Sequence, residues 1–486
     1  MTKSINCFSR VLCALLLCAG LVVAGCTEGP LGDDQNTPEP EAPATITSEN
    51  LTYYSATFTG HLNVAASDLS FSQVIVYYSD AKTFNMNAAQ SASATSFDKD
   101  QNFTITLANL KENTKYKYCV VAQVKSEKTY GDVLEFTTLP HPYNVVHDLT
   151  ISSATDLSSS ASANCYIVSN GGLYKFKTVK GNSSESVGNV ASASILWETF
   201  GTSKTPEYLD LIKAVDYENS YIAFQTADTF KEGNAVIAAK DASGNILWSW
   251  HIWLTDQPQC QVYYNYAGTT GTMMDRNLGA NSTTPGDVGA LGLLYQWGRK
   301  DPFLGSSSIS SNPLAKSTIT WPYEVSSDSS TGTIAYATAH PTTFITYNRI
   351  NKDWYYTGSS STDNTRWTTS EMSKSIYDPC PPGWRVPDGG SYGIWNTGSY
   401  QYDWTNIGVN FSSMFVLDLT SWYPASGCRS NSGGMLSYVD NGYYWSASPD
   451  GYYAYGLYFD YNGGVNPSYR VTRAYGCSVR CLQEYF

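Results

Sequence analysis

The chain has 486 residues, only 15% of them charged, and its formal net charge is −13. This acidic balance, without any cluster of Lys or Arg, argues against binding to a nucleic-acid backbone. The length suffices for roughly three domains. The 38 Tyr and 13 Trp, among many small polar residues, favour strands and turns over helices. We therefore predict a mainly β protein that does not bind nucleic acid.

The N-terminus has the pattern of a secretory signal. Lys3 and Arg10 precede an apolar run over residues 11–23, which is too short for a membrane span. Residues 22–26 (VVAGC) resemble the bacterial lipoprotein signal, which implies that residues 1–25 are cleaved and that Cys26 carries a lipid anchor. The alternative is an ordinary signal peptide followed by a chance cysteine.

Residues 26–44 are polar, acidic and rich in proline, so they cannot bury enough apolar surface to fold. We expect an extended tether here. Acidic residues behind a lipidated cysteine also resemble the export signal of Bacteroidetes surface lipoproteins. The expected location is therefore the outer membrane, lipid-anchored and on the cell surface.

Residues 45–139 have the alternation of a β-sandwich. Apolar and polar residues alternate in 55–64 (SATFTGHLNV) and in several later runs, as in strands with one buried face. Leu110, Thr114 and Tyr116 follow the L-x-x-x-T-x-Y spacing, which resembles the tyrosine corner of fibronectin type III domains. This resemblance implies a fibronectin type III-like domain over 45–139, in which Cys119 is a buried thiol.

Residues 140–258 are predicted to form a second β-sandwich. Near its end, residues 246–254 (ILWSWHIWL) are apolar on both faces, which indicates a central strand covered on both sides. His251 lies in this run. Because no nucleophile signature accompanies it, we interpret it as a packed structural histidine rather than a catalytic one.

Residues 259–486 carry an ordered series of short motifs. They are MMDRNLGA (273–280), LLYQWGRKDPF (293–303), DPCPPGWRVP (378–387), WYPASGCRSNSGG (422–434), GYYWSAS (442–448) and GCSVRC (476–481). This order resembles the Fibrobacter succinogenes major paralogous domain, and the whole chain is similar to fimbrillin-like surface lipoproteins. The resemblance implies an α+β C-type-lectin-like fold. Unlike the family pattern, Gly389 and Gly390 stand where a short helix is usual.

Seven cysteines remain after the signal and the lipidated residue, in a compartment that permits disulfides. Cys380 and Cys481 match the two cysteines of the family, so the resemblance implies a bridge between them. In a final strand Cys477 and Cys481 would share a face, so we also expect a Cys428–Cys477 bridge beside the first.

The alternative for these cysteines is a metal or redox site, as in formylglycine-generating enzymes of the same fold. However, C-x₃-C without a neighbouring His is not a standard ligand pattern. The calcium-dependent sugar loops of lectins are also absent. We therefore predict no catalytic residue, no metal and no cofactor.

The segment 440–464 is dense in tyrosine and tryptophan, and in alternating strands one set of rings must face outward. Such rings suit stacking on sugars or binding to a protein partner. The predicted ligand-binding residues are Tyr443, Tyr444, Trp445, Tyr453, Tyr455 and Tyr458. The alternative is that these rings fill a glycine-rich core.

Together these features predict two β-sandwiches followed by a C-type-lectin-like domain. The expected function is non-enzymatic recognition or adhesion toward glycans or toward host or microbial surface proteins. The alternative is an accessory subunit of a fimbria-like assembly, and a redox or metal enzyme is disfavoured.

Overall fold

The described part of the chain divides into two compact units, the first ending at Thr137 and the second beginning at Thr138. The computed structural model describes residues 44–52, 55–108, 110–111, 114–139, 149–200, 210–265, 268, 270–306, 324–369, 373–397, 400–412, 420–432, 436–437 and 440–484. The predicted signal, Cys26 and all of the tether except Ala44 lie outside these residues.

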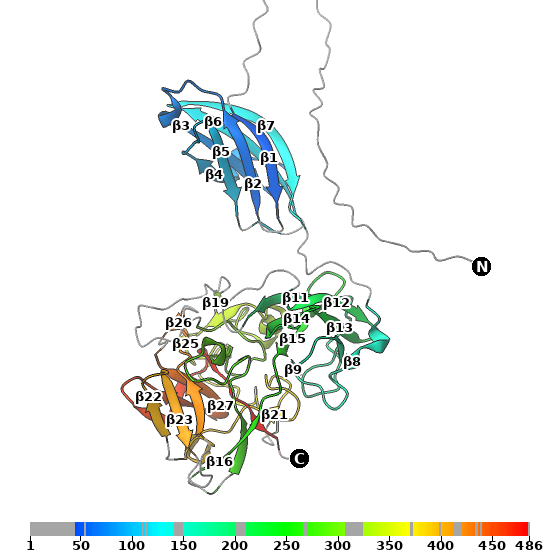
Figure 1. Cartoon of the computed structure of the whole chain (residues 1–486), viewed down its shortest axis with the longest axis vertical. Coiled ribbons are helices and arrows are strands. Elements are labelled where there is room, and N and C mark those ends of the chain that lie inside the picture. The colour runs from blue at the N-terminus through cyan, green and yellow to red at the C-terminus, as the bar shows by residue number, and fades with distance from the viewer. Residues whose placement is uncertain are drawn as a thin grey trace, which may run out of the picture. The chain divides into compact units, whose positions relative to one another are not determined.

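The first unit is a sandwich of a three-stranded and a four-stranded sheet (Figure 1). The three-stranded sheet has the order β1 (Ala44–Leu51), β2 (Ala56–Leu62), β5 (Asn102–Leu107). The four-stranded sheet has the order β4 (Gln90–Ala94), β3 (Ser72–Ser79), β6 (Lys115–Val124), β7 (Glu127–Thr137). The 3-10 turns η1 (Leu69–Phe71) and η2 (Met86–Ala88) flank β3. Strand pairing is antiparallel throughout.

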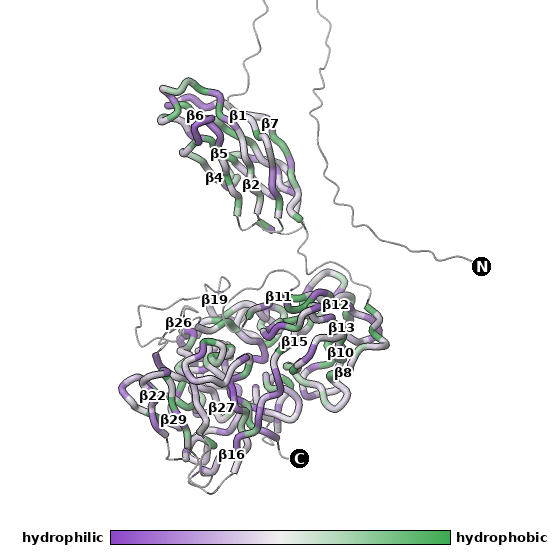
Figure 2. Tube along the Cα trace, in the orientation of Figure 1, coloured by the Kyte–Doolittle hydropathy of each residue, from purple (hydrophilic) through white to green (hydrophobic). Residues whose placement is uncertain are grey.

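The core of the first unit follows from the alternation in its sequence. Every second residue of β2 is buried, and Figure 2 shows hydrophobic and hydrophilic residues interspersed along these strands. Tyr116 of the predicted corner is buried and stacks on Phe136, with ring centroids 5.3 Å apart. Cys119 is a buried thiol that donates to the carbonyl of Gly131, and burial raises its pKa. The predicted β-sandwich is confirmed.

The second unit begins with another pair of four-stranded sheets. One sheet has the order β12 (Ile212–Glu218), β13 (Tyr221–Thr226), β10 (Leu173–Lys177), β8 (Thr155–Asp156). The other has the order β11 (Ser192–Thr199), β14 (Gly233–Lys240), β15 (Ile246–Leu254), β9 (Cys165–Val168). The turn η4 (Ile151–Ser153) precedes β8. Apolar residues of both sheets, such as Phe224 and Trp250, form one core between them. β15 pairs with β14 on one side and β9 on the other, as expected for a central strand.

The rest of the second unit consists of four further sheets with long loops. The first sheet has the order β16 (Cys260–Tyr264), β17 (Thr270–Met274), β31 (Leu482–Gln483), β21 (Trp384–Arg385). The largest has the order β26 (Leu436–Ser437), β25 (Cys428–Arg429), β30 (Gly476–Ser478), β27 (Gly442–Asp450), β28 (Tyr453–Phe459), β29 (Val465–Thr472), and β18 (Leu294–Gln296) also pairs with β30. The two smaller sheets are β22 (Tyr400–Asp403), β23 (Gly408–Ser412), β24 (Thr420–Pro424), and the pair β19 (Glu324–Ser326), β20 (Phe344–Thr346). Short helical turns are η5 (Val288–Ala290), α1 (Ile334–Ala339) and η6 (Gly390–Tyr392). Within the described residues, no helix is long and apolar enough to cross a membrane.

The predicted boundary between residues 258 and 259 does not separate two compact units. Cys165 and Trp253, from the second sandwich, belong to the same core cluster as Met274 and Cys380. The indole of Trp253 also donates to the carbonyl of Ala280 at 3.0 Å. The two segments share apolar and polar contacts and lie in one compact unit.

Candidate functional site

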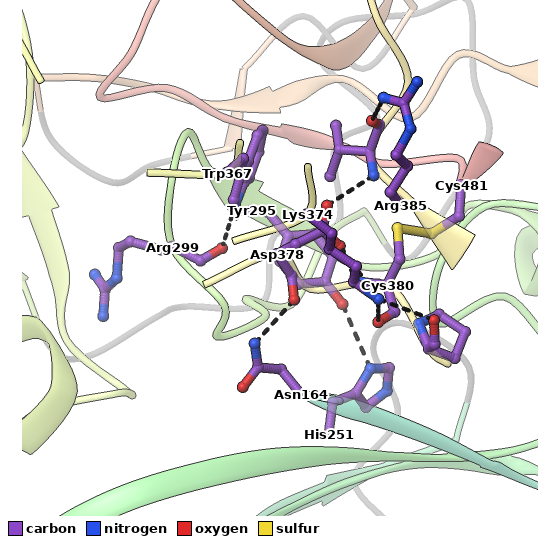
Figure 3. Close-up of a disulfide and its surroundings, with 12 residues drawn as sticks. Asn164, His251, Tyr295, Arg299, Trp367, Lys374, Asp378, Cys380, Arg385 and Cys481 are labelled. Carbon is purple, nitrogen blue, oxygen red and sulfur yellow. Dashed lines mark hydrogen bonds and ion pairs between the residues drawn. A yellow bond between two sulfur atoms is a disulfide. The ribbon is translucent and has the colours of Figure 1, made fainter. Parts of the chain in front are cut away.

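The predicted Cys380–Cys481 disulfide is present, and its cysteines are 101 residues apart in the sequence (Figure 3). Around it, the stretch 378–387 makes a tight turn. Gly383 adopts a φ of +79°, which glycine tolerates best, and the amide of Trp384 donates to the carbonyl of Pro381. β21 then pairs with β31, next to Cys481. The bridge therefore ties this turn to the last strand of the chain.

A buried charged pair supports this turn from the other side (Figure 3). The carboxylate of Asp378 accepts the backbone N–H groups of Cys380 and Val386, each at 2.9 Å. Lys374 donates its ammonium to the carbonyl of Cys380 at 2.9 Å and lies 3.9 Å from Asp378. The amide of Asn164 donates to the carbonyl of Asp378, which links the turn to the second sandwich. All donors here have partners, so the arrangement is structural.

The predicted Cys428–Cys477 bridge is not formed. Both residues are buried and neither is in a disulfide. The pairing of Arg429 with Gly476 between β25 and β30 places the two cysteines opposite each other. Burial, together with Cys428, raises the pKa of Cys477 well above its usual range. The two cysteines thus occupy facing positions on neighbouring strands and are not bridged. Cys165 is also an unbridged buried thiol, and Cys260 is an unbridged exposed one.

His251 is held inside the second unit and is 1% exposed. Its Nε2 lies 2.8 Å from the amide oxygen of Asn234, and its Nδ1 is 3.4 Å from the hydroxyl of Tyr295 (Figure 3). Burial lowers the pKa of His251 to about 3, so the ring is neutral at pH 7. A ring this deep cannot meet a substrate, and its contacts are those of a structural histidine.

This burial makes acid stability a test of the histidine's surroundings. The unfolded chain protonates His251 below its usual pKa of about 6.5, whereas the folded chain does so only near 3. The stabilisation that comes from keeping His251 neutral is fully present above pH 6.5. Between pH 6.5 and 3, the free energy of unfolding falls by roughly 1.4 kcal/mol for each pH unit of acidification. We expect urea titrations at pH 7 to 4 to show a shallower loss of stability for His251→Gln. Parallel curves for both proteins would contradict the assignment.

The predicted aromatic platform is largely inside the protein. Tyr444 and Trp445 are 0% exposed and Tyr443 is 9% exposed, so these three cannot stack on a ligand. The indole of Trp445 donates to the carbonyl of Tyr295, and the hydroxyl of Tyr444 donates to that of Pro424. Both faces of β27 are covered by distant segments, and the alternative of core filling is correct for these residues.

The other three predicted rings are half-buried. Tyr453 binds Lys352 through its hydroxyl at 2.9 Å. Tyr455 packs against Gly389 and Gly390, where a Cβ on Gly389 would lie 2.9 Å from the Tyr455 Cβ. This close approach leaves no room for a side chain at position 389. Tyr458 stacks on Tyr469 at 4.6 Å and donates to Asp460. These rings therefore have structural partners.

Exposed aromatic rings occur at several places, the most exposed being Tyr392 at 78%, and two of them lie at neighbouring hairpin ends. Trp404, in the turn between β22 and β23, is 58% exposed, and Tyr461, between β28 and β29, is 47% exposed. A Cβ on Gly463, in the same turn as Tyr461, would lie 3.6 Å from the Trp404 ring. We call Trp404, Tyr461 and Gly463 the hairpin-tip surface. Sequence reasoning missed Trp404 because it follows a short strand outside the tyrosine-rich segment.

Side-chain hydrogen bonds hold the two turns behind this surface. The carboxylate of Asp403 accepts the amides of Thr405 and Asn406, and that of Asp460 accepts those of Asn462 and Gly464. Buried Tyr402 supports the Trp404 ring at a centroid distance of 4.6 Å. The surface is thus preorganised and bordered by negative charge.

A second internal cluster surrounds Asp353, which is 0% exposed. Its carboxylate pairs with the guanidinium of Arg366 and lies 3.8 Å from that of Arg473. Both guanidiniums stack on Trp297, with Arg473 at 4.3 Å. Arg473 also donates to the carbonyls of Asp363 and Gly451, among others. This cluster fixes the loops around it. Across the described parts of the chain, no group of three or more His, Cys, Asp or Glu could hold a metal ion.

No protein-family model matches the chain, and no curated protein matches it. Solved structures similar to it include three of the sensor domain of the anti-sigma factor RsgI4 from Pseudobacteroides cellulosolvens. A solution structure is 20% identical over 20% of this chain and 74% of that one. A shorter form is 22% identical, and the match covers 21% of this chain and 99% of that one. A longer form is 18% identical, and the match covers 22% of this chain and 97% of that one. All three have a TM-score of 0.17, and we base no inference on them.

Proposed function

We propose that this protein is a lipid-anchored, non-enzymatic recognition protein of the outer-membrane surface, which binds neutral glycans through the hairpin-tip surface. The observation that carries the proposal is the exposure of Trp404 and Tyr461 on two adjoining, hydrogen-bonded turns. Exposed aromatic rings cover the apolar face of a sugar ring, while nearby amides and hydroxyls bond its hydroxyl groups. The surrounding carboxylates disfavour sialylated or sulfated sugars.

The location and domain type in this proposal rest on the sequence. The VVAGC motif at 22–26 supports lipidation of Cys26, and the acidic tether supports surface exposure. The ordered motifs of residues 259–486 support a Fibrobacter succinogenes major paralogous domain of C-type-lectin-like fold. The bridge between Cys380 and Cys481 is consistent with that family.

The test is a glycan and mucin binding screen with the purified mature protein and its Trp404→Ala variant. We expect neutral glycans among the ligands and a loss of about 10-fold or more in affinity for the variant, because truncating an aromatic hot spot costs roughly 2 kcal/mol.

Tyr130→Ala in the first unit is the matched control, since Tyr130 is 57% exposed and comparable with Trp404. We expect this variant to bind like the wild type. An equal loss for both variants, or glycan binding that survives Trp404→Ala unchanged, would refute the assigned surface.

A further inference from the structure

A groove of about 660 Å³ lies between the second sandwich and the disulfide-linked turn. One wall is the loop 158–162, and a second is the loop 182–184. Lys374, together with Pro382 and Gly383 of the turn, also lines the groove. We call this the serine groove. Its volume is in the range of roughly 300–1,000 Å³ that is typical of small-ligand sites, which often form where two segments meet.

The walls of the serine groove are held in place by the protein itself. Ser162 donates to the carbonyl of Ser183 at 2.6 Å and accepts its N–H at 2.9 Å, which locks the two loops together. The amide of Asn182 donates to the carbonyl of Ser375 at 2.6 Å. The amide of Glu484 donates to the carbonyl of Gly383 at 2.9 Å. A ligand would therefore meet a preorganised site, which lowers the entropic cost of binding.

The polar groups directed to the serine groove suit hydroxyl-rich ligands. Ser159, Ser160, Ser184 and Ser373 line it, and their hydroxyls make no hydrogen bond to other described residues. Each hydroxyl can both donate and accept, as sugar hydroxyls can. None of the described residues that line the groove is aromatic, and their small polar side chains suit hydroxyl groups better than flat apolar rings.

The charges in the serine groove give no preference for an anion. Lys177 and Glu484 carry opposite charges. The ammonium of Lys374 is already bonded to the carbonyls of Cys380 and Pro381, at 2.9 and 3.1 Å. From this geometry we propose that the serine groove is a binding site for a neutral oligosaccharide of about two or three sugar units. The site is distinct from the hairpin-tip surface and does not depend on it.

The experiment uses the mature protein and a panel of neutral trisaccharides of gluco, manno and galacto configuration, measured by calorimetric titration. Ser160→Trp and Ser184→Trp place a large ring in the groove, and Ser243→Trp, in an exposed hairpin turn, is the matched control. We expect at least one trisaccharide to bind, with a loss of about 10-fold or more for both groove variants. Ser243→Trp and Trp404→Ala are expected to keep this binding.

Each other outcome overturns the inference. If no trisaccharide bound at concentrations up to about 10 mM, the groove would not be an oligosaccharide-binding site. Tighter binding of sialyllactose, or of a Gly-Ser pentapeptide, that the groove variants abolish would contradict the ligand class. If Trp404→Ala abolished trisaccharide binding and both groove variants kept it, the trisaccharide would bind at the hairpin-tip surface. That result would support the proposed function and contradict the serine-groove site.

Discussion

Replacing both Cys380 and Cys481 by serine is expected to lower the free energy of unfolding of the second unit by about 4–5 kcal/mol. The bridge closes a loop of 101 residues. In the chain-entropy model, a closed loop of this length removes roughly 4.7 kcal/mol of conformational freedom from the unfolded chain. Guanidinium titration followed by tryptophan fluorescence measures the change.

Cys260→Ser is the control for this double variant, because Cys260 is an exposed thiol outside the bridge. It should unfold like the wild type. Wild-type protein treated with a reductant should approach the double variant. A difference below about 1 kcal/mol between bridged and unbridged protein would mean that the surrounding contacts alone close the loop.

Asp353→Ala is expected to destabilise the second unit by about 3–5 kcal/mol, the second large effect. The substitution leaves Arg366 and Arg473 buried without their shared counter-charge, and uncompensated buried charges are costly. Asp353→Asn keeps an acceptor oxygen but loses the charge, so its loss should be smaller. Chemical denaturation of the three proteins gives this order.

Asp228→Ala is the comparison for a surface ion pair, since Asp228 is 88% exposed and pairs with Lys213. Its expected effect is below about 1 kcal/mol. If Asp353→Ala were no worse than Asp228→Ala, the buried cluster would contribute nothing beyond an exposed salt bridge.

The sequence was sufficient where one local pattern determined the structure. Period-two alternation predicted the sandwich of the first unit, and a run that is apolar on both faces predicted the central position of β15. The family motifs implied the bridge between Cys380 and Cys481, which the structure contains. Tyr116 of the tyrosine-corner pattern lies in the core of the first unit.

Patterns of period two failed where distant segments cover a strand. Tyr443 and Trp445 lie on one face of β27 and Tyr444 on the other, but only the fold reveals that both faces are buried. Val409 and Tyr423, from β23 and β24, cover the Tyr444 face. For the same reason, the joint core around Trp253 and Met274 was not apparent as a feature of either segment alone.

If the proposed lipid anchor holds the N-terminus, the disulfide also has a mechanical consequence. If a ligand pulls on Tyr461 while the anchor holds, the segment of roughly 80 residues between Cys380 and Tyr461 can unfold and extend in the unbridged chain, by about 3.4 Å per residue. The bridge offers a shorter route through Cys481, of roughly 20 residues. Tension at the hairpin-tip surface is thus carried by a covalent crosslink, and the reach of the extended chain stays short.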